Sequence, residues 1–329
     1  AIARSKFQLN LAIRVVQSRL ARRMLAATQE DGMPTVIQNM SNELAGVVET
    51  AGSAVVRVEG RRRLSASGIV WSKDGVIVTA HHVLERDDGL SLGFGGEEKV
   101  TAELVGRDPG TDLAVLRSDQ KGMKPGDWID ADSVRVGHLV LALGRPGRTV
   151  QATLGIVSAL GTSWRTAAGG MVDRYLQTDV VMYPGFSGGP LVNVEGKVLG
   201  LNTSALRGVS LAIPTSTVRR VVDAILAHGK VRRGYLGVGV QPVRLPQALA
   251  KELGQETGLI LVSVEPGSPA DKGGLLLGDS LLSVDGAPVR QLDELLDLLS
   301  HEFVDREVVL RILRAGGVLE QKVRIGERE

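Results

Sequence analysis

Short apolar runs separated by turn residues fill the chain from residue 54 to residue 214, and this pattern constrains the fold more than any other feature. The runs are rich in Val, Leu, Ile and Thr, and Gly, Asp, Pro and Asn stand between them. No helical stretch of about 10–15 residues separates consecutive runs, as parallel βαβ units would require. The pattern therefore predicts a β-barrel or a β-sandwich. The expected strands are Ala54–Val58, Ala66–Trp71, Val76–Ala80, Ala102–Gly106, Ala114–Arg117, Leu139–Leu143, Gln151–Leu160, Arg174–Thr178, Leu191–Asn193, Val198–Thr203 and Ser210–Ile213.

The composition agrees with a turn-rich β protein and excludes several classes of site. Glycine accounts for 41 of 329 residues, well above the usual share of about 7%. The absence of cysteine excludes disulfides, Cys-ligated zinc, iron–sulfur clusters and cysteine nucleophiles. The net charge of +2 argues against a nucleic-acid-binding protein. No apolar stretch approaches the length of about 18 residues that a membrane span needs.

The first 29 residues form a basic segment that contains no Asp or Glu. Leu9, Ile13, Val16 and Leu20 recur at helical spacing and predict an amphipathic helix. Three roles remain open for this helix. It could pack on the body of the protein or on a neighbouring subunit, adhere to an anionic membrane surface, or be the remnant of a targeting segment.

A basic, glycine-flanked hinge at residues 228–234 is the expected domain boundary. We expect an N-terminal helical segment over residues 1–50, a strand-rich domain over 51–228 that ends in the helix Thr215–Ala227, and an α+β domain over 234–329. A second helix in the N-terminal segment is expected to end near Gly52. The elements expected in the last domain are the strands Tyr235–Gln241, Gly258–Val264, Ser280–Val284, Val308–Arg314 and Glu320–Ile325, a turn at Gly316–Gly317, and the helices Pro246–Leu253 and Gln291–Ser300.

The strongest signal of a functional site is the segment Gly185-Phe-Ser187-Gly-Gly189. A serine hydroxyl becomes an effective nucleophile when a base takes its proton, and a developing oxyanion needs backbone N–H groups, which glycine lets approach closely. The segment also fits the nucleophile elbow of α/β-hydrolases, which requires Ser, then Asp or Glu, then His along the chain. After Ser187 comes a strand instead of a helix, and the only later histidines, His228 and His301, lie in the hinge and the last domain. The elbow interpretation is therefore rejected.

A base and a carboxylate lie upstream, in the order His, Asp, Ser that chymotrypsin-type enzymes use. His81 and His82 end an apolar run, and Asp112 precedes another. Adjacent residues of a strand point to opposite faces, so at most one of the two histidines is expected to face a cleft. The same alternation argues against a His–His metal site.

These segments resemble those of the HtrA (Deg) family of trypsin-like serine proteases. The family's histidine motif matches Thr79–Val83 and makes His82 the base, its aspartate motif matches Thr111–Leu116 and gives Asp112, and its serine motif gives Ser187. The resemblance covers residues 45–325. It implies a mainly β fold, in which a chymotrypsin-like double β-barrel of two six-stranded barrels precedes an α+β PDZ domain, with the N-terminal helical segment outside both.

The resemblance also implies an oxyanion hole formed by Gly185, Phe186 and Ser187, with the amides of Gly185 and Ser187 as donors. The family usually has Asn where Tyr183 and Phe186 stand. Whether these two residues alter the oxyanion loop is left open. Asp179 is expected to have a structural role near the site.

The S1 pocket is expected to be apolar, because the segments that would line it contain no carboxylate at its base. This lining predicts cleavage after small or medium apolar residues. The expected S1 residues are Val181, Met182, Leu211 and Ile213.

The last domain resembles the PDZ domain that follows HtrA proteases. Its carboxylate-binding loop would hold a peptide C-terminus by backbone N–H groups, and the following strand would accept the peptide as an added strand. The residues of this loop are Tyr235, Leu236, Gly237 and Val238. The opposite wall of the groove would include some of Leu292, Leu295, Leu296 and Leu299, while the others face the core. Arg61–Arg63, in the first domain, is expected to be a solvated loop end.

The resemblance implies an ATP-independent serine endopeptidase that degrades unfolded or misfolded proteins in quality control and the stress response. The expected partners are such polypeptides, peptide C-termini and further copies of the chain in a homotrimer or higher oligomer. A peripheral membrane contact through the N-terminal helix is left open. The expected location is extracytoplasmic, in the periplasm or cell envelope. No cofactor, metal ion or nucleic acid is expected. The alternative is a catalytically silent PDZ adaptor or chaperone with a pseudoprotease domain.

Overall fold

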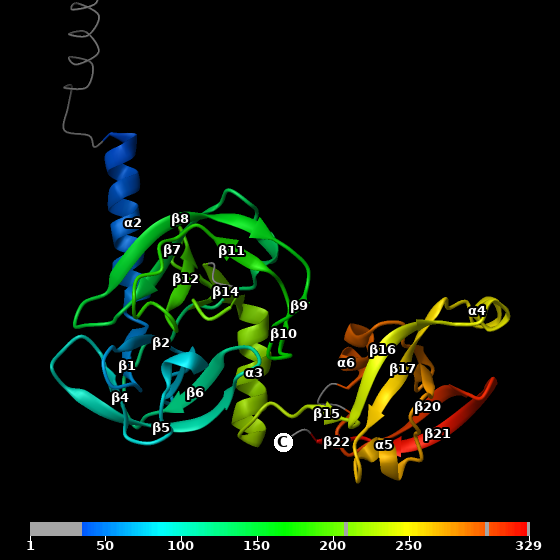
Figure 1. Ribbon diagram of the computed structural model, residues 1–329. Coiled ribbons are helices and arrows are strands. Elements are labelled where there is room, and N and C mark those ends of the chain that lie inside the picture. The colour runs from blue at the N-terminus through cyan, green and yellow to red at the C-terminus, as the bar shows by residue number, and fades with distance from the viewer. Residues whose placement is uncertain (1–34, 207–209, 300–302, 328–329) are drawn as a thin grey trace, which may run out of the picture. The chain divides into compact units, whose positions relative to one another are not determined.

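The computed structural model describes residues 35–206, 210–299 and 303–327 (Figure 1). The basic segment predicted to form the first helix, residues 1–29, lies outside the described residues. The second expected helix is α2 (Val36–Gly52), and its N-cap residue Thr35 accepts a hydrogen bond from the amide of Gln38 at 3.2 Å. Over the described ranges, no helix is both long and apolar enough to cross a bilayer.

Six strands close the first barrel, in the order β1-β2-β3-β6-β5-β4. Every residue of β2 and β3 is buried, so their sequences do not alternate between apolar and charged residues, and their two polar members, Ser67 and Thr79, are buried as well. A 3-10 helix, η1 (His81–Val83), follows β3 directly. The strand bounds are β1 (Val55–Glu59), β2 (Ala66–Val70), β3 (Val76–Ala80), β4 (Leu90–Gly93), β5 (Lys99–Asp108) and β6 (Leu113–Arg117).

Six further strands close the second barrel, in the order β11-β14-β13-β12-β7-β8. The two barrels confirm the predicted fold class, and α3 (Thr215–His228) confirms the predicted helix after the strands. The strand bounds are β7 (Leu139–Gly144), β8 (Gln151–Leu160), β11 (Leu176–Thr178), β12 (Pro190–Asn193), β13 (Val198–Thr203) and β14 (Leu211–Pro214).

Within the strand-rich domain, the sequence pattern missed three short strands. β4 is four residues long and ends in glycine, while β9 (Trp164–Arg165) and β10 (Met171–Val172) form a two-residue ribbon of their own. Segments this short carry too few side chains to establish a period of two. Their pairing partners, which lie elsewhere in the chain, decide that they are strands.

The contacts of the chain form two compact units. Among the described residues, the first comprises those up to Glu103 together with Arg117–Thr166 and those from Met171 to Ser216, and the second comprises Leu104–Leu116, Ala167–Gly170 and those from Thr217 onwards. The second unit therefore contains the turn between β5 and β6 as well as the C-terminal domain.

The C-terminal domain is built on an antiparallel sheet in the order β16-β17-β18-β20-β21, with β19 paired to β18 and a separate pair β15-β22. The expected turn at Gly316–Gly317 lies one residue earlier, because Ala315 and Gly316 both have positive φ, as a type I′ hairpin requires, and Gly317 already belongs to β21. The bounds are β15 (Gly234–Tyr235), β16 (Val238–Arg244), α4 (Gln247–Leu253), β17 (Thr257–Val264), α5 (Pro269–Lys272), β18 (Ser280–Val284), β19 (Ala287–Pro288), α6 (Leu292–Leu298), β20 (Glu307–Arg314), β21 (Gly317–Arg324) and β22 (Gly326–Glu327).

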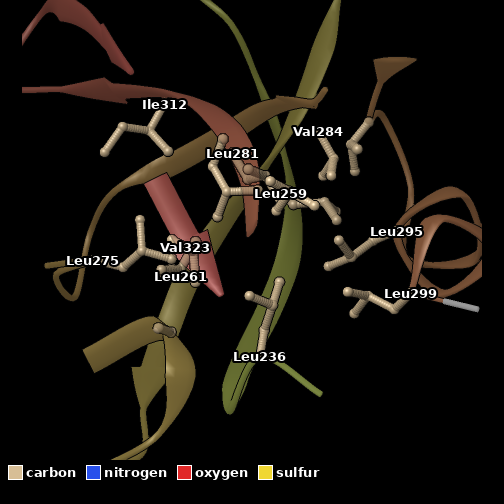
Figure 2. Packing of buried hydrophobic residues seen from close by; sticks show 14 of the residues in the cluster. Leu236, Leu259, Leu261, Leu275, Leu281, Val284, Leu295, Leu299, Ile312 and Val323 are labelled. Carbon is tan, nitrogen blue, oxygen red and sulfur yellow. The ribbon is translucent and has the colours of Figure 1, made fainter. Parts of the chain in front are cut away.

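The core of this domain lies between the sheet and α6. Figure 2 shows Leu259, Leu261 and Leu281 from the sheet and Leu295 of α6, which belong to one buried cluster, and all four are at most 2% exposed. Burial of one such leucine contributes about 1.5–3 kcal/mol. Of the four leucines in the α6 region, Leu295 and Leu299 therefore face the core, while Leu292 is 45% exposed.

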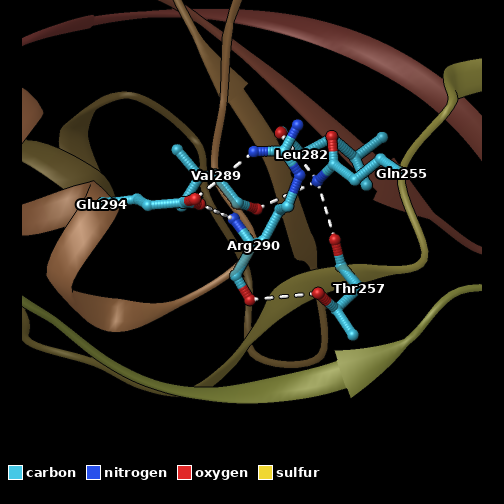
Figure 3. A network of polar contacts seen from close by, with 6 residues as sticks. All are labelled: Gln255, Thr257, Leu282, Val289, Arg290 and Glu294. Atoms are coloured by element: carbon cyan, nitrogen blue, oxygen red, sulfur yellow. Dashed lines mark hydrogen bonds and ion pairs between the residues drawn. The ribbon is translucent and has the colours of Figure 1, made fainter.

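A polar network holds the start of α6 against the sheet (Figure 3). The buried side-chain amide of Gln255 donates to the carbonyl oxygens of Thr257, Leu282 and Val289 at 2.7, 3.2 and 3.0 Å. Arg290 donates its backbone N–H to the Glu294 carboxylate at 2.6 Å. These bonds position the helix that forms one side of the expected peptide groove.

Candidate active site

Ser187 lies on a tight turn between β11 and β12 that only glycine permits at two positions. Gly185 and Gly188 have φ of 93° and 89°, in the region that side chains other than glycine rarely adopt. A Cβ atom at Gly188 would also lie 2.0 Å from the carbonyl oxygen of Ser67, and one at Gly185 would lie 2.8 Å from that of Ser65. The glycines of the motif therefore allow the turn to press against the start of β2.

Hydrogen bonds engage most of the peptide groups of this turn. The amide of Phe186 donates to the carbonyl of Tyr183 at 3.0 Å, and the carbonyls of Gly185 and Ser187 accept from the side chain and the amide of Ser67 at 2.7 and 3.2 Å. Among the described residues, none accepts a hydrogen bond from the amide of Gly185 or of Ser187. Two N–H groups, two residues apart on one rigid turn, are what an oxyanion needs.

Ser67 fixes this turn, and the sequence analysis missed it. Its fully buried hydroxyl donates to the carbonyl of Gly185 and accepts from the backbone N–H of Arg145 at 2.7 Å. The guanidinium of Arg145 in turn donates to the carbonyls of Val55 and Gly52 at 2.7 and 3.1 Å. Burial, aided by the positive charge of Arg57, lowers the pKa of the Arg145 guanidinium. No local sequence signal distinguishes Ser67 from the other serines of the chain.

Phe186 anchors the turn in the core of the second barrel. Its side chain is 0% exposed and packs with Val140, Ala142 and Leu191. A Cβ atom at Gly144 would lie 2.7 Å from the Phe186 ring, so that glycine makes room for it. The ring of Tyr183 meets it edge-on at 5.8 Å. The phenyl group thus lies in the barrel interior, while the backbone of the turn carries the amides described above.

The hydroxyl of Ser187 has a neighbour that the sequence analysis did not identify. Its Oγ lies 3.0 Å from the Oγ of Ser204, which follows the end of β13. Ser187 is 6% exposed, whereas Ser204 is exposed. The contact arises because β12 and β13 are paired neighbours in the barrel.

His82 lies in η1, directly after β3, and not in the strand itself. The expectation that strand alternation separates His81 from His82 is therefore wrong, because a helical turn replaces the alternation, and both side chains are half-buried. The amide of Glu85, just beyond η1, donates to the carbonyl of Gly60 at 3.0 Å. This bond ties the histidine turn to the loop between β1 and β2.

Asp112 lies in the buried turn between β5 and β6, 3% exposed and with a φ of 60°. The carboxylate of Asp108 holds this turn by accepting from the amide of Gly110 at 3.1 Å and from the amide and hydroxyl of Thr111 at 3.3 and 2.7 Å. Arg233, which precedes β15, forms an ion pair with the same carboxylate at 2.6 Å. Asp112 belongs to the second unit, and His82 and Ser187 belong to the first, so their pairing stays a prediction from chain order.

The expected S1 residues differ in exposure. Leu211 and Ile213 of β14 are 3% and 1% exposed, Met182 packs partly buried against the core of the second barrel, and Val181 is 55% exposed. Their grouping in one pocket stays a prediction. The carboxylate of Asp179 accepts from the amide of Ile156 at 2.6 Å, which agrees with the structural role expected for it.

The expected peptide-binding loop joins β15 to β16. Gly237 has a φ of 79°, and a Cβ atom there would lie 2.3 Å from that of Ser268, so only glycine fits. Leu236 is buried in the domain core, and the hydroxyl of Tyr235 hydrogen-bonds to the Glu265 carboxylate. Val238 begins β16, an edge strand of the sheet whose outer side can accept a further strand.

Within the described residues, no cluster of His, Asp and Glu could hold a metal ion.

Comparison with known proteins finds two family models along the chain. Residues 66–201 match the trypsin-like peptidase domain, and residues 234–325 match the PDZ domain. A protein of Chlamydia muridarum named "Probable periplasmic serine endoprotease DegP-like" is 33% identical over 276 residues, which cover 82% of this chain and 55% of that protein. A protein of the same name from Rhizobium meliloti is 39% identical over 246 residues, covering 71% of this chain and 48% of that protein. The chain thus spans about half the length of these curated relatives.

Solved structures cover this chain more completely. The "HtrA-type protease AlgW with tripeptide" is 32% identical, with a TM-score of 0.71, and the match covers 87% of this chain and 97% of that one. The serine endoprotease from Yersinia pestis is 30% identical, with a TM-score of 0.72, over 90% of this chain and 100% of that one.

Proposed function

Because the chain belongs to the HtrA family of serine proteases, we propose that it is an ATP-independent serine endopeptidase that degrades unfolded or misfolded polypeptides. The observation that carries this proposal is the turn of Ser187, in which the amides of Phe186, Gly188 and Gly189 donate hydrogen bonds within the described residues while those of Gly185 and Ser187 do not. Two nearby amide N–H groups without another acceptor can donate hydrogen bonds to the oxyanion that develops in acyl transfer.

In the proposed mechanism, His82 takes the proton of the Ser187 hydroxyl as Oγ attacks the scissile carbonyl. Asp112 holds the imidazole in the required tautomer and stabilises the imidazolium. The amides of Gly185 and Ser187 bind the oxyanion, and His82 then gives the proton to the leaving amine. Water repeats the cycle on the acyl-enzyme, and this releases the second product.

The proposed substrates bind at two places. Polypeptide enters the cleft with a small or medium apolar residue in an S1 pocket lined by Val181, Met182, Leu211 and Ile213. Peptide C-termini bind the loop at Tyr235–Val238 and extend along β16. The curated relatives are named as periplasmic proteins, and this chain is accordingly extracytoplasmic. The solved relatives include AlgW with a tripeptide and with a decapeptide.

A fluorophosphonate probe tests the proposal, because it reacts with activated serines. Wild-type protein is expected to be labelled, Ser187→Ala protein is not, and a control variant of an exposed serine in the same unit, Ser163→Ala, retains labelling. If the wild-type protein is not labelled even when a C-terminal peptide is added, the catalytically silent PDZ adaptor is the better assignment.

The cut sites in denatured casein test the S1 proposal separately, since cuts after Lys or Arg would contradict it.

We also propose that the chain assembles into homotrimers or higher oligomers. Val36, Ile37 and Met40 lie on the first turns of α2 and are 85%, 75% and 45% exposed, an apolar stripe that assembly would cover. Light scattering of the full chain is expected to give at least three times the mass of one chain. Replacing all three residues by Ser is expected to reduce that mass, and an unchanged mass would exclude this stripe from the interface.

A further inference from the structure

Three consecutive arginines, Arg61–Arg63, form the loop between β1 and β2, and the proposed mechanism does not use them. Arg62 and Arg63 are exposed, and Arg61 is half-buried, with its Nε donating to the carbonyl of Leu64 at 2.6 Å. Within the described parts of the chain, none of the three guanidinium groups forms an ion pair with a carboxylate. Neighbouring positive charges repel one another, and this repulsion raises the free energy of the folded loop unless an anionic group offsets it.

The arginine loop lies between the two turns that carry His82 and Ser187. On one side, the carbonyl of Ser65 packs against Gly185, and the amide of Ser67 donates to the carbonyl of Ser187. Two residues of chain span at most about 7 Å, so the Cα atom of Arg63 lies within about that distance of the Cα atom of Ser65.

On the other side, the histidine turn contacts the same loop. The amide of Glu85 donates to the carbonyl of Gly60 at 3.0 Å, and the amide of Arg62 approaches the Glu85 carboxylate at 3.5 Å. Glu85 lies two residues beyond the end of η1. The loop is therefore attached to both catalytic turns of the first unit.

A concavity of about 350 Å³ opens on this loop, lined by Arg61, Arg62, Arg63, Leu64 and Glu85. Leu64 is 42% exposed there. Glu85 supplies one negative charge against three positive ones, and the acidic pair Asp87–Asp88 does not line the concavity. An apolar wall beside unpaired guanidinium groups suits a side chain with an aliphatic stem and a carboxylate end, as in glutamate.

We propose that this concavity is a subsite for an acidic side chain of the polypeptide substrate, close to the scissile bond. The inference rests on the proposed protease function. Arginine binds carboxylate by paired hydrogen bonds, and the field of the cluster raises the local concentration of acidic segments. Because the groups are exposed, the gain in kcat/KM is about 3- to 10-fold at low ionic strength and falls as salt screens the charges.

The test uses internally quenched peptides that share one apolar cleavage sequence and differ in one flanking residue, Glu or Gln, placed in turn at each of three positions on either side of the bond. Wild-type protein is expected to cleave the Glu peptide about 3- to 10-fold faster than the Gln peptide at one or more positions. In Arg62→Ser/Arg63→Ser protein this ratio is expected to fall to about 1, with cleavage of the Gln peptide unchanged. Arg61 is retained because it holds the loop through Leu64.

The matched control is Lys121→Ser/Lys124→Ser, which removes the same charge from two exposed lysines elsewhere in the first unit and is expected to keep the preference. A Glu/Gln ratio of 1 in wild-type protein, or an equal loss in both double variants, would overturn the subsite. Failure to cleave any peptide, together with absent fluorophosphonate labelling, would instead refute the protease function. Loss of binding to vesicles containing phosphatidylserine in the arginine variant, without any Glu preference in the wild type, would assign the cluster to a membrane surface and also overturn the proposal.

Discussion

The turn of Ser187 and the turn that precedes Asp112 are both buried and rigid, but they are held by different forces. Neutral groups clamp the first, since hydrogen bonds join it to Ser67, the hydroxyl of Ser204 and surrounding peptide groups. A charge clamps the second, since the carboxylate of Asp108 accepts two amides, a hydroxyl and the guanidinium of Arg233. A neutral clamp leaves the amides of Gly185 and Ser187 as the donors towards an oxyanion, whereas a fixed carboxylate beside them would oppose the negative charge that forms there.

The clamps also differ in what would break them. Steric fit and buried neutral bonds hold the Ser187 turn, so loss of space is expected to harm it most. The Asp108 turn depends on a partner for a buried charge, so loss of that partner is expected to harm it most. The following substitutions separate the two cases, in order of decreasing effect.

Gly188→Ala is expected to have the largest effect. The new Cβ would meet the carbonyl oxygen of Ser67 at 2.0 Å, and the backbone has positive φ, so we expect a loss of at least about 3 kcal/mol and no fluorophosphonate labelling. Denaturant unfolding measures the first quantity. In the control Gly122→Ala, φ is also positive but nothing lies within 4 Å, so only backbone strain of about 1–2 kcal/mol is expected. Equal losses in the two variants would show that space at Gly188 is not decisive.

Arg233→Met is expected to destabilise the Asp108 turn by about 1–3 kcal/mol. Asp108 is 4% exposed and would lose its ion pair with the guanidinium, but Arg233 is itself 31% exposed, which reduces the cost. Hydrogen exchange at the amides of Gly110 and Thr111 measures the loss. The control is Arg232→Met, whose carboxylate partners Asp305 and Glu327 are more exposed than Asp108. A smaller effect is expected there, and an equal one would contradict the role of burial.

Ser67→Ala is expected to cost about 1–3 kcal/mol, because the amide of Arg145 and the carbonyl of Gly185 both lose a buried partner. Labelling of Ser187 is expected to slow by about tenfold, as the turn that carries the donors loosens. Ser118→Ala is the control, since that buried hydroxyl accepts one long bond, from Gln120 at 3.4 Å. Unchanged labelling in Ser67→Ala would exclude Ser67 from holding the oxyanion turn.

A second charge-held turn, at Asp279 in the C-terminal domain, tests the comparison through pH. Burial raises the pKa of Asp279, but the hydrogen bonds from Arg314, at 2.7 Å, and from the amide of Leu276 outweigh it and leave the pKa below its ordinary value. The stabilisation is therefore complete above the unfolded pKa of about 3.9 and is lost as the pH falls through the lower folded pKa. Hydrogen exchange at Leu276, corrected for the intrinsic rate, is expected to accelerate in that range, and Arg314→Met is expected to flatten the response. The Ser187 turn, which no carboxylate clamps, provides the internal control.

Ser204→Ala is expected to have the smallest effect. The Ser204 hydroxyl competes for the Ser187 Oγ at 3.0 Å, and a neutral bond at an exposed residue contributes little. We expect labelling about 2- to 5-fold faster and unchanged unfolding. Slower labelling would mean that Ser204 assists the nucleophile instead of competing for it.

The parts of this molecule that could be predicted from sequence are those that depend on neighbours in the chain. The strands β2, β3 and β13 are predominantly apolar segments, and the helix α3 shows its period within one segment. The turn glycines Gly185, Gly188 and Gly237 could be recognised because positive φ is a local requirement. The hairpin turn needs positive φ at two consecutive residues, Ala315 and Gly316, and its predicted position was wrong by one residue.

The sequence by itself determined a turn-rich β domain, a separate C-terminal domain and the order of His82, Asp112 and Ser187, because each of these depends on short stretches of chain. The sequence pattern left a barrel and a sandwich open, and strand pairing in the tertiary structure decided for two closed barrels. Only the tertiary structure decided that Ser67 donates to Gly185, 118 residues away, and that Arg233 pairs with Asp108, 125 residues away. Such partners depend on strand register and on which buried polar group would otherwise lack a bond. The residues next to a serine or an arginine in the sequence do not indicate which carbonyl or carboxylate it will bind in the folded protein.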